Sequence, residues 1–277
     1  MDKNEFLICI DSDGCAIDSM NHKHLNFFGP ALISTWKLQN CADEVQQKWN
    51  QVNLFSKTRG INRFLGLKIT LESLKEGGIS LTDLKPLQEW TSVASVLSNN
   101  TLEEYIVQHS HGDNDLTVLH KALEWSFAVN DKIKNDKTAS PPFLEVEATL
   151  KEIAKIADVA IVSSANKSAV KEEWAAAGFE PYVKELCTQE EGSKSFCIKK
   201  LIENNGYEKN KALMVGDALG DLAAAQENDI CFYPIIAGDE ATSWKNLRTE
   251  VLNAFINGAY KNEIHQSVLD KFYKILK

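Results

Sequence analysis

Four short runs of apolar residues, each followed at once by polar residues, glycine or proline, constrain the fold of this chain more than any other feature. The runs occupy residues 5–10, 159–162, 212–215 and 230–233. Short runs that are apolar throughout are typical of strands buried on both faces, as in a parallel sheet. Helical patterns of about 10–15 residues lie between the later runs. The sequence therefore predicts an α/β fold with a doubly wound parallel sheet.

The stretch between the first two runs breaks this alternation. It holds amphipathic segments and no convincing strand, which predicts an all-helical domain inserted after the first strand. The segments span residues 54–74, 81–97, 102–107 and 116–134. A proline-stiffened turn at residues 136–142 predicts the return to the sheet. We therefore expect a sheet domain of residues 1–19 and 141–277, ending in two amphipathic helices divided near Gly258, and a helical domain of residues 20–140.

Composition and charge exclude several classes of protein. The chain has 277 residues, is 44% hydrophobic and carries a formal net charge of −9. A protein this acidic lacks the basic face that nucleic-acid binding requires. No apolar segment is long enough to cross a membrane, and the N-terminus lacks the pattern of a signal peptide. The six scattered cysteines indicate reduced thiols. We expect a cytoplasmic protein with no nucleic-acid or membrane partner, and the sequence carries no signal for an oligomeric state.

Polar residues with catalytic potential stand where the predicted strands end. In an open parallel sheet, the ligand crevice lies beyond the carboxyl ends of the strands. The residues at these ends are Asp11, Asp13, Ser163, Asp217 and Asp221, and Lys194 opens a helix between the last two groups. Each alone has a simpler explanation, such as a turn, a helix cap or a solvated lysine. A calcium loop is disfavoured because Cys15 and Ala16 occupy positions that need other residue types.

Together these residue types form a coherent set for phosphoryl transfer. Crowded carboxylates repel one another, and a divalent cation relieves the repulsion. Ligands that are all oxygen favour Mg²⁺. The Asp11 carboxylate can attack phosphorus, and Asp13 can protonate the leaving oxygen and then activate water. Ser163 and Lys194 can hold the transferred phosphoryl oxygens. The pattern predicts a Mg²⁺-dependent phosphohydrolase.

On these residues the chain resembles the haloacid dehalogenase superfamily, in the branch with a helical cap after the first motif. Phosphoglycolate phosphatases and β-phosphoglucomutases belong to that branch. The motifs that carry the resemblance are Asp11-Ser-Asp13-Gly14, Ser163, Lys194 in Gly-Ser-Lys, and Val-Gly-Asp217-Ala-Leu-Gly-Asp221. The resemblance implies that Asp11 is the nucleophile and Asp13 the general acid and base. It also implies that the Asp11 carboxylate, the Asp13 carbonyl and Asp217 hold Mg²⁺, with Asp221 as a ligand or a partner through water.

One position departs from the pattern of this branch. Ser195 follows Lys194, where proline is common. The other lysines nearby that could serve in place of Lys194 are Lys184, Lys199 and Lys200. We expect further substrate contacts from residues beside the motifs, namely Gly14, Ser164 and Asn166.

A segment of the helical domain is similar to the cap loop with which β-phosphoglucomutase-like enzymes contact substrate. Its candidate substrate-binding residues are Lys57, Arg59, Asn62 and Arg63. The two guanidinium groups could clamp a second anionic group of the substrate. They could equally be ordinary exposed charges of a helix.

The leading hypothesis is a phosphatase for a small phosphorylated metabolite, because a cap that closes over the site suits small substrates. A β-phosphoglucomutase-like phosphomutase would share every motif. A phosphonoacetaldehyde hydrolase-like phosphonatase would need a lysine for a Schiff base, for which Lys57 is a candidate. A dehalogenase is disfavoured because those enzymes need no Mg²⁺ and both Asp13 and Asp217 are present. An inactive module that binds a phosphorylated ligand is disfavoured because every motif residue is intact.

Overall fold

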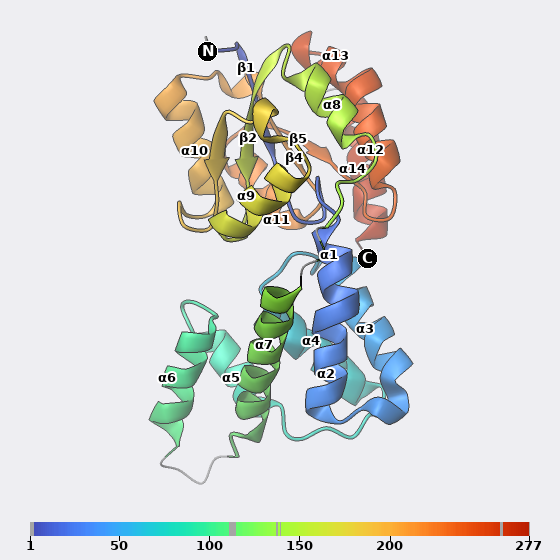
Figure 1. Cartoon of the computed structure of the whole chain (residues 1–277), viewed down its shortest axis with the longest axis vertical. Helices are drawn as coiled ribbons and strands as arrows, with labels where there is room; N and C mark the ends of the chain where they lie inside the picture. The colour runs from blue at the N-terminus through green and yellow to red at the C-terminus, as the bar shows by residue number, and fades with distance from the viewer. Residues whose placement is uncertain (1–2, 111–114, 137, 139, 261–262, 277) are drawn as a thin grey trace. The chain divides into compact units, whose positions relative to one another are not determined.

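The computed structural model describes residues 3–110, 115–136, 138, 140–260 and 263–276. Two residues of the predicted return turn, 137 and 139, lie outside the described residues. The chain forms two compact units (Figure 1). The sheet unit consists of Met1–Met20 and Ala139–Lys277, and the helical unit consists of Asn21–Thr138.

Five parallel strands form the sheet in the order β3-β2-β1-β4-β5. Their bounds are β1 Phe6–Ile10, β2 Ala157–Val162, β3 Glu185–Cys187, β4 Ala212–Gly216 and β5 Cys231–Pro234. From β1 the chain winds first toward β3 and then back toward β5. The predicted α/β fold, with a parallel sheet and a helical region between β1 and β2, is confirmed. In sheets with such a reversal, ligands bind at the carboxyl ends of the strands, here beside the end of β1.

The register of strand pairing brings the predicted site residues to one edge of the sheet. Ile10 pairs with Ile161 of β2 and with Val215 of β4. Because all the strands are parallel, the residues that follow these pairs emerge at the same edge. These residues are Asp11, Ser163 and Asp217.

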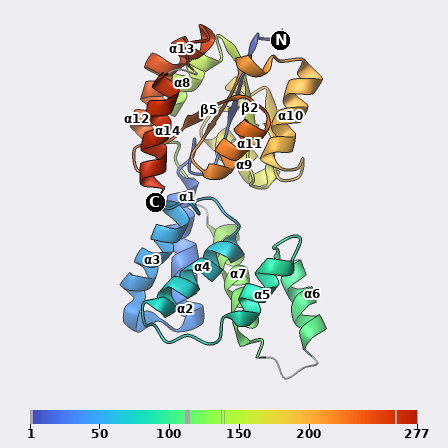
Figure 2. The same cartoon turned by 180° about the vertical axis from the view of Figure 1, so that it is seen from behind.

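Helices cover both faces of the sheet. Alternate residues of β1 face opposite sides, with Ile8 and Ile10 in one buried cluster and Leu7 and Cys9 in the other. The first cluster includes residues of α8 Val146–Ile153, α9 Lys167–Ala176, α12 Glu240–Asn246, η5 Leu247–Val251 and α13 Leu252–Ile256. The second includes residues of α10 Lys194–Asn205, α11 Leu219–Glu227 and α14 Glu263–Ile275. Figures 1 and 2 show α10 and α12 on opposite sides of the strands. Two short turns, η3 Glu180–Tyr182 and η4 Lys209–Lys211, complete the unit.

The helical unit packs around buried aromatic side chains. Its elements are α1 Ser19–Lys23, η1 His24–Phe28, α2 Gly29–Trp36, η2 Gln39–Cys41, α3 Ala42–Leu54, α4 Arg63–Glu76, α5 Lys85–Val93, α6 Asn99–His109 and α7 Thr117–Asn135. The rings of Phe28, Trp49 and Trp125 contact one another, with centroid distances of 5.6–5.8 Å. Phe64 contacts both Trp125 and Trp90. Such ring pairs bury large apolar areas and favour one relative placement of the helices.

The structure differs from the sequence prediction in several places, and η1, α2 and all but the last residue of α3 lie before the first predicted amphipathic segment. Strand β3 was not predicted, because its three residues, Glu-Leu-Cys, form no apolar run. Residues 54–74, predicted as one amphipathic stretch, are interrupted between Leu54 and Arg63. Gly60 in the interruption has a φ of +74°, which a helix cannot accommodate. The predicted division of the C-terminal helices near Gly258 is confirmed, since its φ is +69°.

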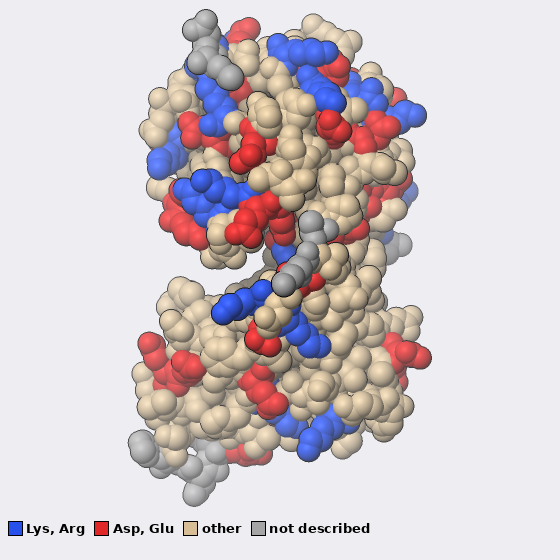
Figure 3. Space-filling model, viewed as in Figure 1, with Lys and Arg blue, Asp and Glu red and all other residues tan. Residues whose placement is uncertain are grey.

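Charged side chains of both signs are mixed on the face of the molecule drawn in Figure 3. On the face in Figure 3, the Lys and Arg side chains of the sheet unit lie among Asp and Glu side chains. The described residues on that face form no broad basic surface of the kind that nucleic acids need. Within the described parts of the chain, every helix is too short or too polar to traverse a lipid bilayer.

Replacing Gly66 with alanine tests the packing of α3 against α4. The added Cβ would lie 2.1 Å from Oδ1 of Asn53. The Asn53 amide is held by Trp49 O at 2.9 Å, so it has little room to move. We expect Gly66→Ala to lower the free energy of unfolding by about 1–3 kcal/mol, as overpacking does, measured by urea unfolding with tryptophan fluorescence.

Gly220→Ala is the matched control, because Gly220 is also helical but has nothing within 4 Å of the added Cβ. We expect this variant to be as stable as the parent protein or more stable. Equal stability of the two variants would contradict the proposed close approach at Gly66.

Candidate active site

A tight turn follows β1 and presents the first motif. The Asp11 N–H donates to Val215 O at 3.0 Å, which continues the strand pairing to the predicted nucleophile. Ser12 O then accepts from the N–H groups of Ala16 and Ile17, both at 3.0 Å. Gly14 has a φ of +77°, a conformation that glycine adopts without strain. The sequence Asp-Ser-Asp-Gly therefore reverses the chain at once and leaves Asp11 at the sheet edge.

Two buried tryptophans hold this turn. The indole N–H of Trp174 on α9 donates to Ser12 Oγ at 2.9 Å. The indole N–H of Trp244 on α12 donates to Cys15 O, also at 2.9 Å. Neither tryptophan was among the predicted site residues, because nothing in the spacing links positions so far apart in the chain. Buried hydrogen bonds of this kind fix the segment between Asp11 and Asp13.

Three buried carboxylates meet at the ends of β1 and β4. One oxygen each from Asp11, Asp217 and Asp221 lie within 4.8 Å of one another. Asp221, in the first turn of α11, also accepts a hydrogen bond from Ala218 N at 3.0 Å. Gly216 makes room for it, because a Cβ at that position would lie 2.3 Å from Asp221 Cγ. Position 216 therefore requires glycine, because the Asp221 side chain occupies the space that a Cβ would need.

Lys194 reaches this cluster from the start of α10. Its Nζ lies 2.9 Å from Asp11 Oδ1 and 2.6 Å from Asp221 Oδ1. The alternative lysines lie elsewhere, since Lys184 pairs with Asp158 at 2.9 Å and Lys199 pairs with Glu203 on the surface. Lys200 is exposed on the same helix as Lys194. Among the candidates, Lys194 is the lysine in contact with Asp11.

Burial and neighbouring charge shift the pKa values in this cluster. Burial raises the pKa of Asp11 well above its ordinary value; the Lys194 ammonium opposes this, and Asp221 and Asp217 add to it. Burial alone would lower the pKa of Lys194, but the Asp11 and Asp221 carboxylates outweigh it and raise that pKa. Lys194 therefore remains charged, and one cation faces three carboxylates.

The donor set fits a hard divalent cation. All three side chains offer carboxylate oxygens, and the cluster contains no sulfur or imidazole ligand. The three carboxyl groups outnumber the single ammonium of Lys194. Asp11, Asp217 and Asp221 could therefore hold a metal ion such as Mg²⁺.

Asp13 lies outside this cluster, and its carboxylate accepts a hydrogen bond from Ser19 Oγ. Ser19 is the first residue of α1. Its hydrogen bond therefore joins this helix to Asp13, the predicted general acid, at the end of the first-motif turn. Asp18 in the same turn bonds through its N–H to Pro141 O at 2.9 Å.

The second-motif residues lie at the end of β2. Ser163 is buried, its N–H donates to Cys187 O at 3.0 Å, and its Oγ accepts from Ala165 N at 3.1 Å. Ser164 and Asn166 are exposed. Asn166 caps α9 by accepting from Ala169 N at 2.9 Å, which gives it a structural role besides the predicted substrate contact.

The predicted substrate residues of the helical unit fall into two groups. Lys57 and Asn62 are exposed, and Asn62 also caps α4 by accepting from Phe64 N. Arg59 is buried and donates to Leu54 O at 2.8 Å.

Arg63 makes contacts within its own unit. Its Nη1 donates to Asn130 Oδ1 at 2.6 Å and to Ser126 Oγ at 3.1 Å. Its guanidinium lies 5.2 Å from the ring centroid of Phe28. Contact with an anionic substrate by Arg59 or Arg63 would compete with these internal contacts.

Comparison with known proteins identifies the family of this chain. Residues 85–234 match the family described as haloacid dehalogenase-like hydrolase. That range contains four of the residues above, namely Ser163, Lys194, Asp217 and Asp221, and begins after the first motif. No curated protein matches the chain.

Solved structures share the fold. A haloacid dehalogenase-like family hydrolase from Xanthomonas campestris is similar over 95% of this chain and 97% of its own, with a TM-score of 0.51 and 9% identity. A provisionally assigned phosphoglycolate phosphatase from Lactobacillus delbrueckii subsp. bulgaricus is similar over 83% of this chain and 85% of its own, with a TM-score of 0.51 and 13% identity. Since the family match spans more than half of the 277 residues, the chain belongs to the haloacid dehalogenase-like hydrolase family.

Proposed function

We propose that this protein is a Mg²⁺-dependent phosphatase that hydrolyses a small phosphorylated metabolite through an aspartyl-phosphate on Asp11. One observation carries the proposal: Asp11, Lys194, Asp217 and Asp221, from three separate motifs, converge at the carboxyl edge of the sheet. This convergence joins a candidate nucleophile, a cation site and a fixed positive charge. Phosphoryl transfer depends on positioning and on charge stabilisation of this kind.

In the proposed reaction, an Asp11 carboxylate oxygen attacks phosphorus. A bond forms between that oxygen and phosphorus, and the bond from phosphorus to the ester oxygen breaks. Asp13 donates its proton to the departing oxygen, which leaves as an alcohol. Water then attacks the phosphorus of the aspartyl-phosphate while the Asp13 carboxylate takes its proton. The bond from phosphorus to the Asp11 oxygen breaks, so that inorganic phosphate leaves and the Asp11 carboxylate is regenerated.

The remaining site residues stabilise charge. Asp11, Asp217 and Asp221, with the Asp13 carbonyl, would hold Mg²⁺, which when bound offsets negative charge on the carboxylates and the phosphoryl oxygens. Lys194 supplies a second, fixed positive charge beside Asp11. Ser163 would donate its hydroxyl hydrogen to a phosphoryl oxygen.

We assign substrate selection to residues around this centre. Gly14, Ser164 and Asn166 border the two motif turns of the sheet unit. The helical unit would act as a cap, with the exposed Lys57 and Asn62 as the most accessible of its candidate contacts. A cap that closes over the site admits small substrates and excludes water from the first step.

The variant Asp11→Asn tests the nucleophile. Asparagine keeps the shape of the side chain but cannot attack phosphorus, so kcat should fall at least about a thousandfold. The measurement is Mg²⁺-dependent phosphate release, with circular dichroism to show that the fold is retained. Turnover at the parent rate would refute the mechanism.

Asp158→Asn is the matched control, because Asp158 is also a buried aspartate of the sheet unit. It bonds to Tyr207 and Lys184 rather than to the site. We expect this change to lower stability and to leave kcat unchanged.

Removal of the metal should abolish activity. Treatment with EDTA should stop phosphate release and added Mg²⁺ should restore it, because the three carboxylates need a counter-charge. Asp217→Asn should weaken Mg²⁺ binding by at least about tenfold, measured by isothermal titration calorimetry. Full activity in EDTA, or unchanged Mg²⁺ affinity in the variant, would count against the assignment of this metal site.

A screen of phosphorylated metabolites tests the class of reaction. The expected result is release of inorganic phosphate from a small phosphate monoester when Mg²⁺ is present. If the protein instead only isomerises a sugar phosphate, or cleaves only a carbon–phosphorus bond, the phosphatase proposal is wrong.

A further inference from the structure

Two loops at the carboxyl edge of the sheet run side by side. The loop after β2 carries Ser163, and the loop after β3 ends at Lys194. The Ser163 N–H donates to Cys187 O at 3.0 Å, and the Gln189 N–H donates to Ala165 O at 3.1 Å. The two residues proposed to hold phosphoryl oxygens therefore belong to adjoining segments.

Glu191 closes the second loop on itself. Its N–H donates to Thr188 O at 3.0 Å, which forms a turn. Its carboxylate accepts from Thr188 N at 2.8 Å and from Thr188 Oγ1 at 2.7 Å. Thr188 is fully buried, so this end of the loop is fixed against the sheet. Glu191 lies only three residues before Lys194.

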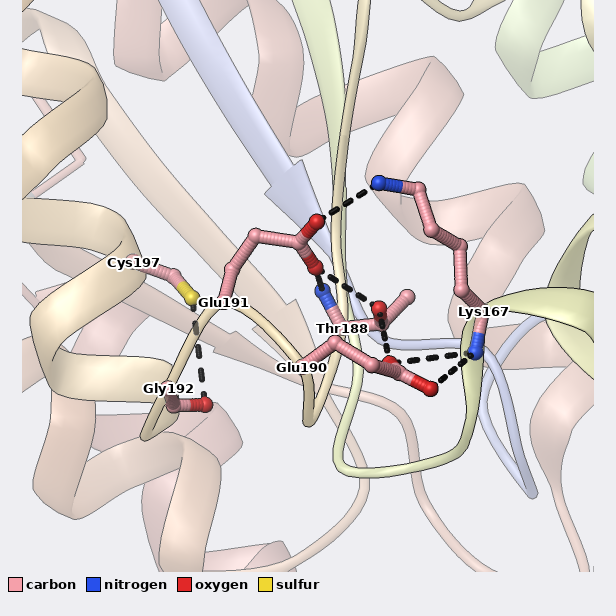
Figure 4. A network of polar contacts seen from close by, with 6 residues as sticks. All are labelled: Lys167, Thr188, Glu190, Glu191, Gly192 and Cys197. Atoms are coloured by element: carbon pink, nitrogen blue, oxygen red, sulfur yellow. Dashed lines mark hydrogen bonds and ion pairs between the residues drawn. The ribbon is translucent and has the colours of Figure 1, made fainter.

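Lys167 joins this turn to the first loop (Figure 4). Its Nζ donates to Glu191 Oε1 at 2.6 Å. Its backbone N–H, at the start of α9, donates to the Glu190 carboxylate at 3.1 Å and 3.2 Å. Thr188 Oγ1 also lies 2.6 Å from Glu190 Oε2. A carboxylate at a helix N-terminus is stabilised by the helix dipole, so Glu190 adds a second link.

Hydrogen bonds in this network stabilise the charged form of Glu191. The hydrogen bond from Lys167, followed by those from Thr188, lowers the pKa of Glu191 to about 2. Glu191 therefore stays ionised at neutral pH. An isolated ion pair on the surface contributes little to stability. The Lys167–Glu191 pair differs, because the Glu191 carboxylate also accepts hydrogen bonds from the backbone N–H and the buried hydroxyl of Thr188.

We propose that Lys167, Thr188, Glu190 and Glu191 form a clamp that positions Lys194 relative to Ser163. The proposal rests on the proposed phosphatase function, since it assigns these residues to the alignment of the phosphoryl-binding groups. Asn228, the residue after α11, holds the first turn of α10, because its Nδ2 donates to Ser195 O at 3.0 Å. The clamp in turn links the loop that ends at Lys194 to the loop that carries Ser163. Its members are positioning residues and are not proposed to touch substrate.

Reactivity of the Lys194 amine tests the clamp without any substrate. Lys194 is 14% exposed and paired with two carboxylates, so it should react slowly with an acylating reagent. In Lys167→Met and Glu191→Gln, the rate of Lys194 acylation, followed by mass spectrometry, should rise about fivefold because the loop opens more often. These variants should fold, because the Lys167 and Glu191 side chains are 45% and 23% exposed.

Lys151→Met is the matched control. Lys151 pairs with Glu147 at 2.6 Å, the same distance as the Lys167–Glu191 pair, within α8, which carries no residue of the clamp. It should leave the Lys194 acylation rate unchanged. Equal rates in the clamp variants, the control and the parent protein would overturn the proposal.

Kinetics give the second readout. With a substrate found by phosphate release, Lys167→Met should lower kcat about tenfold with a smaller change in KM, since charge stabilisation is needed most in the transition state. Lys167→Arg should restore most of kcat. Unchanged kcat in Lys167→Met would reject the positioning role. If no phosphate ester is hydrolysed, the proposed function fails, while the acylation experiment still decides whether the clamp exists.

Discussion

The balance of charge between three buried carboxylates and one buried ammonium is the interaction on which the rest of the site depends. Asp11, Asp217 and Asp221 come from two strand ends and a helix start, and Lys194 comes from another helix. A buried charge is tolerated only when it is paired. The loops and helices that deliver these four side chains must therefore be held in register, and many of the interactions described above serve that requirement.

The sheet and the motif residues could be predicted because their signals are local and strong. Apolar runs mark β1, β2, β4 and β5, and site residues follow the first three of these runs. A parallel sheet brings such ends together whatever the intervening sequence, which is why Asp11 and Asp217 could be placed at one edge. The order of the motifs indicated Lys194 as the site lysine. Its contact with Asp11 in the structure distinguishes it from Lys184 and Lys199.

The contacts that support the site could not be predicted, because they depend on tertiary packing. Trp174 and Ser12 are distant in sequence, and no periodic pattern links them. Strand β3 is too short to give an apolar run, so the loop after it, with Thr188 and Glu191, had no predicted place beside the sheet. In the helical unit, the basic residues looked alike in sequence, yet packing buries Arg59 and leaves Lys57 exposed.

The hydrogen bond from Trp174 to Ser12 also has a spectroscopic consequence. The Trp174 indole bonds to Ser12, which lies in sequence between Asp11 and Asp13, the two residues that carry the proposed chemistry. Indole emission responds to nearby charge and to the strength of its N–H bond. A change in the covalent or ionic state of Asp11 should therefore alter the fluorescence of Trp174. Trp174 would thus serve as an intrinsic optical reporter of events at the proposed nucleophile, with no label attached.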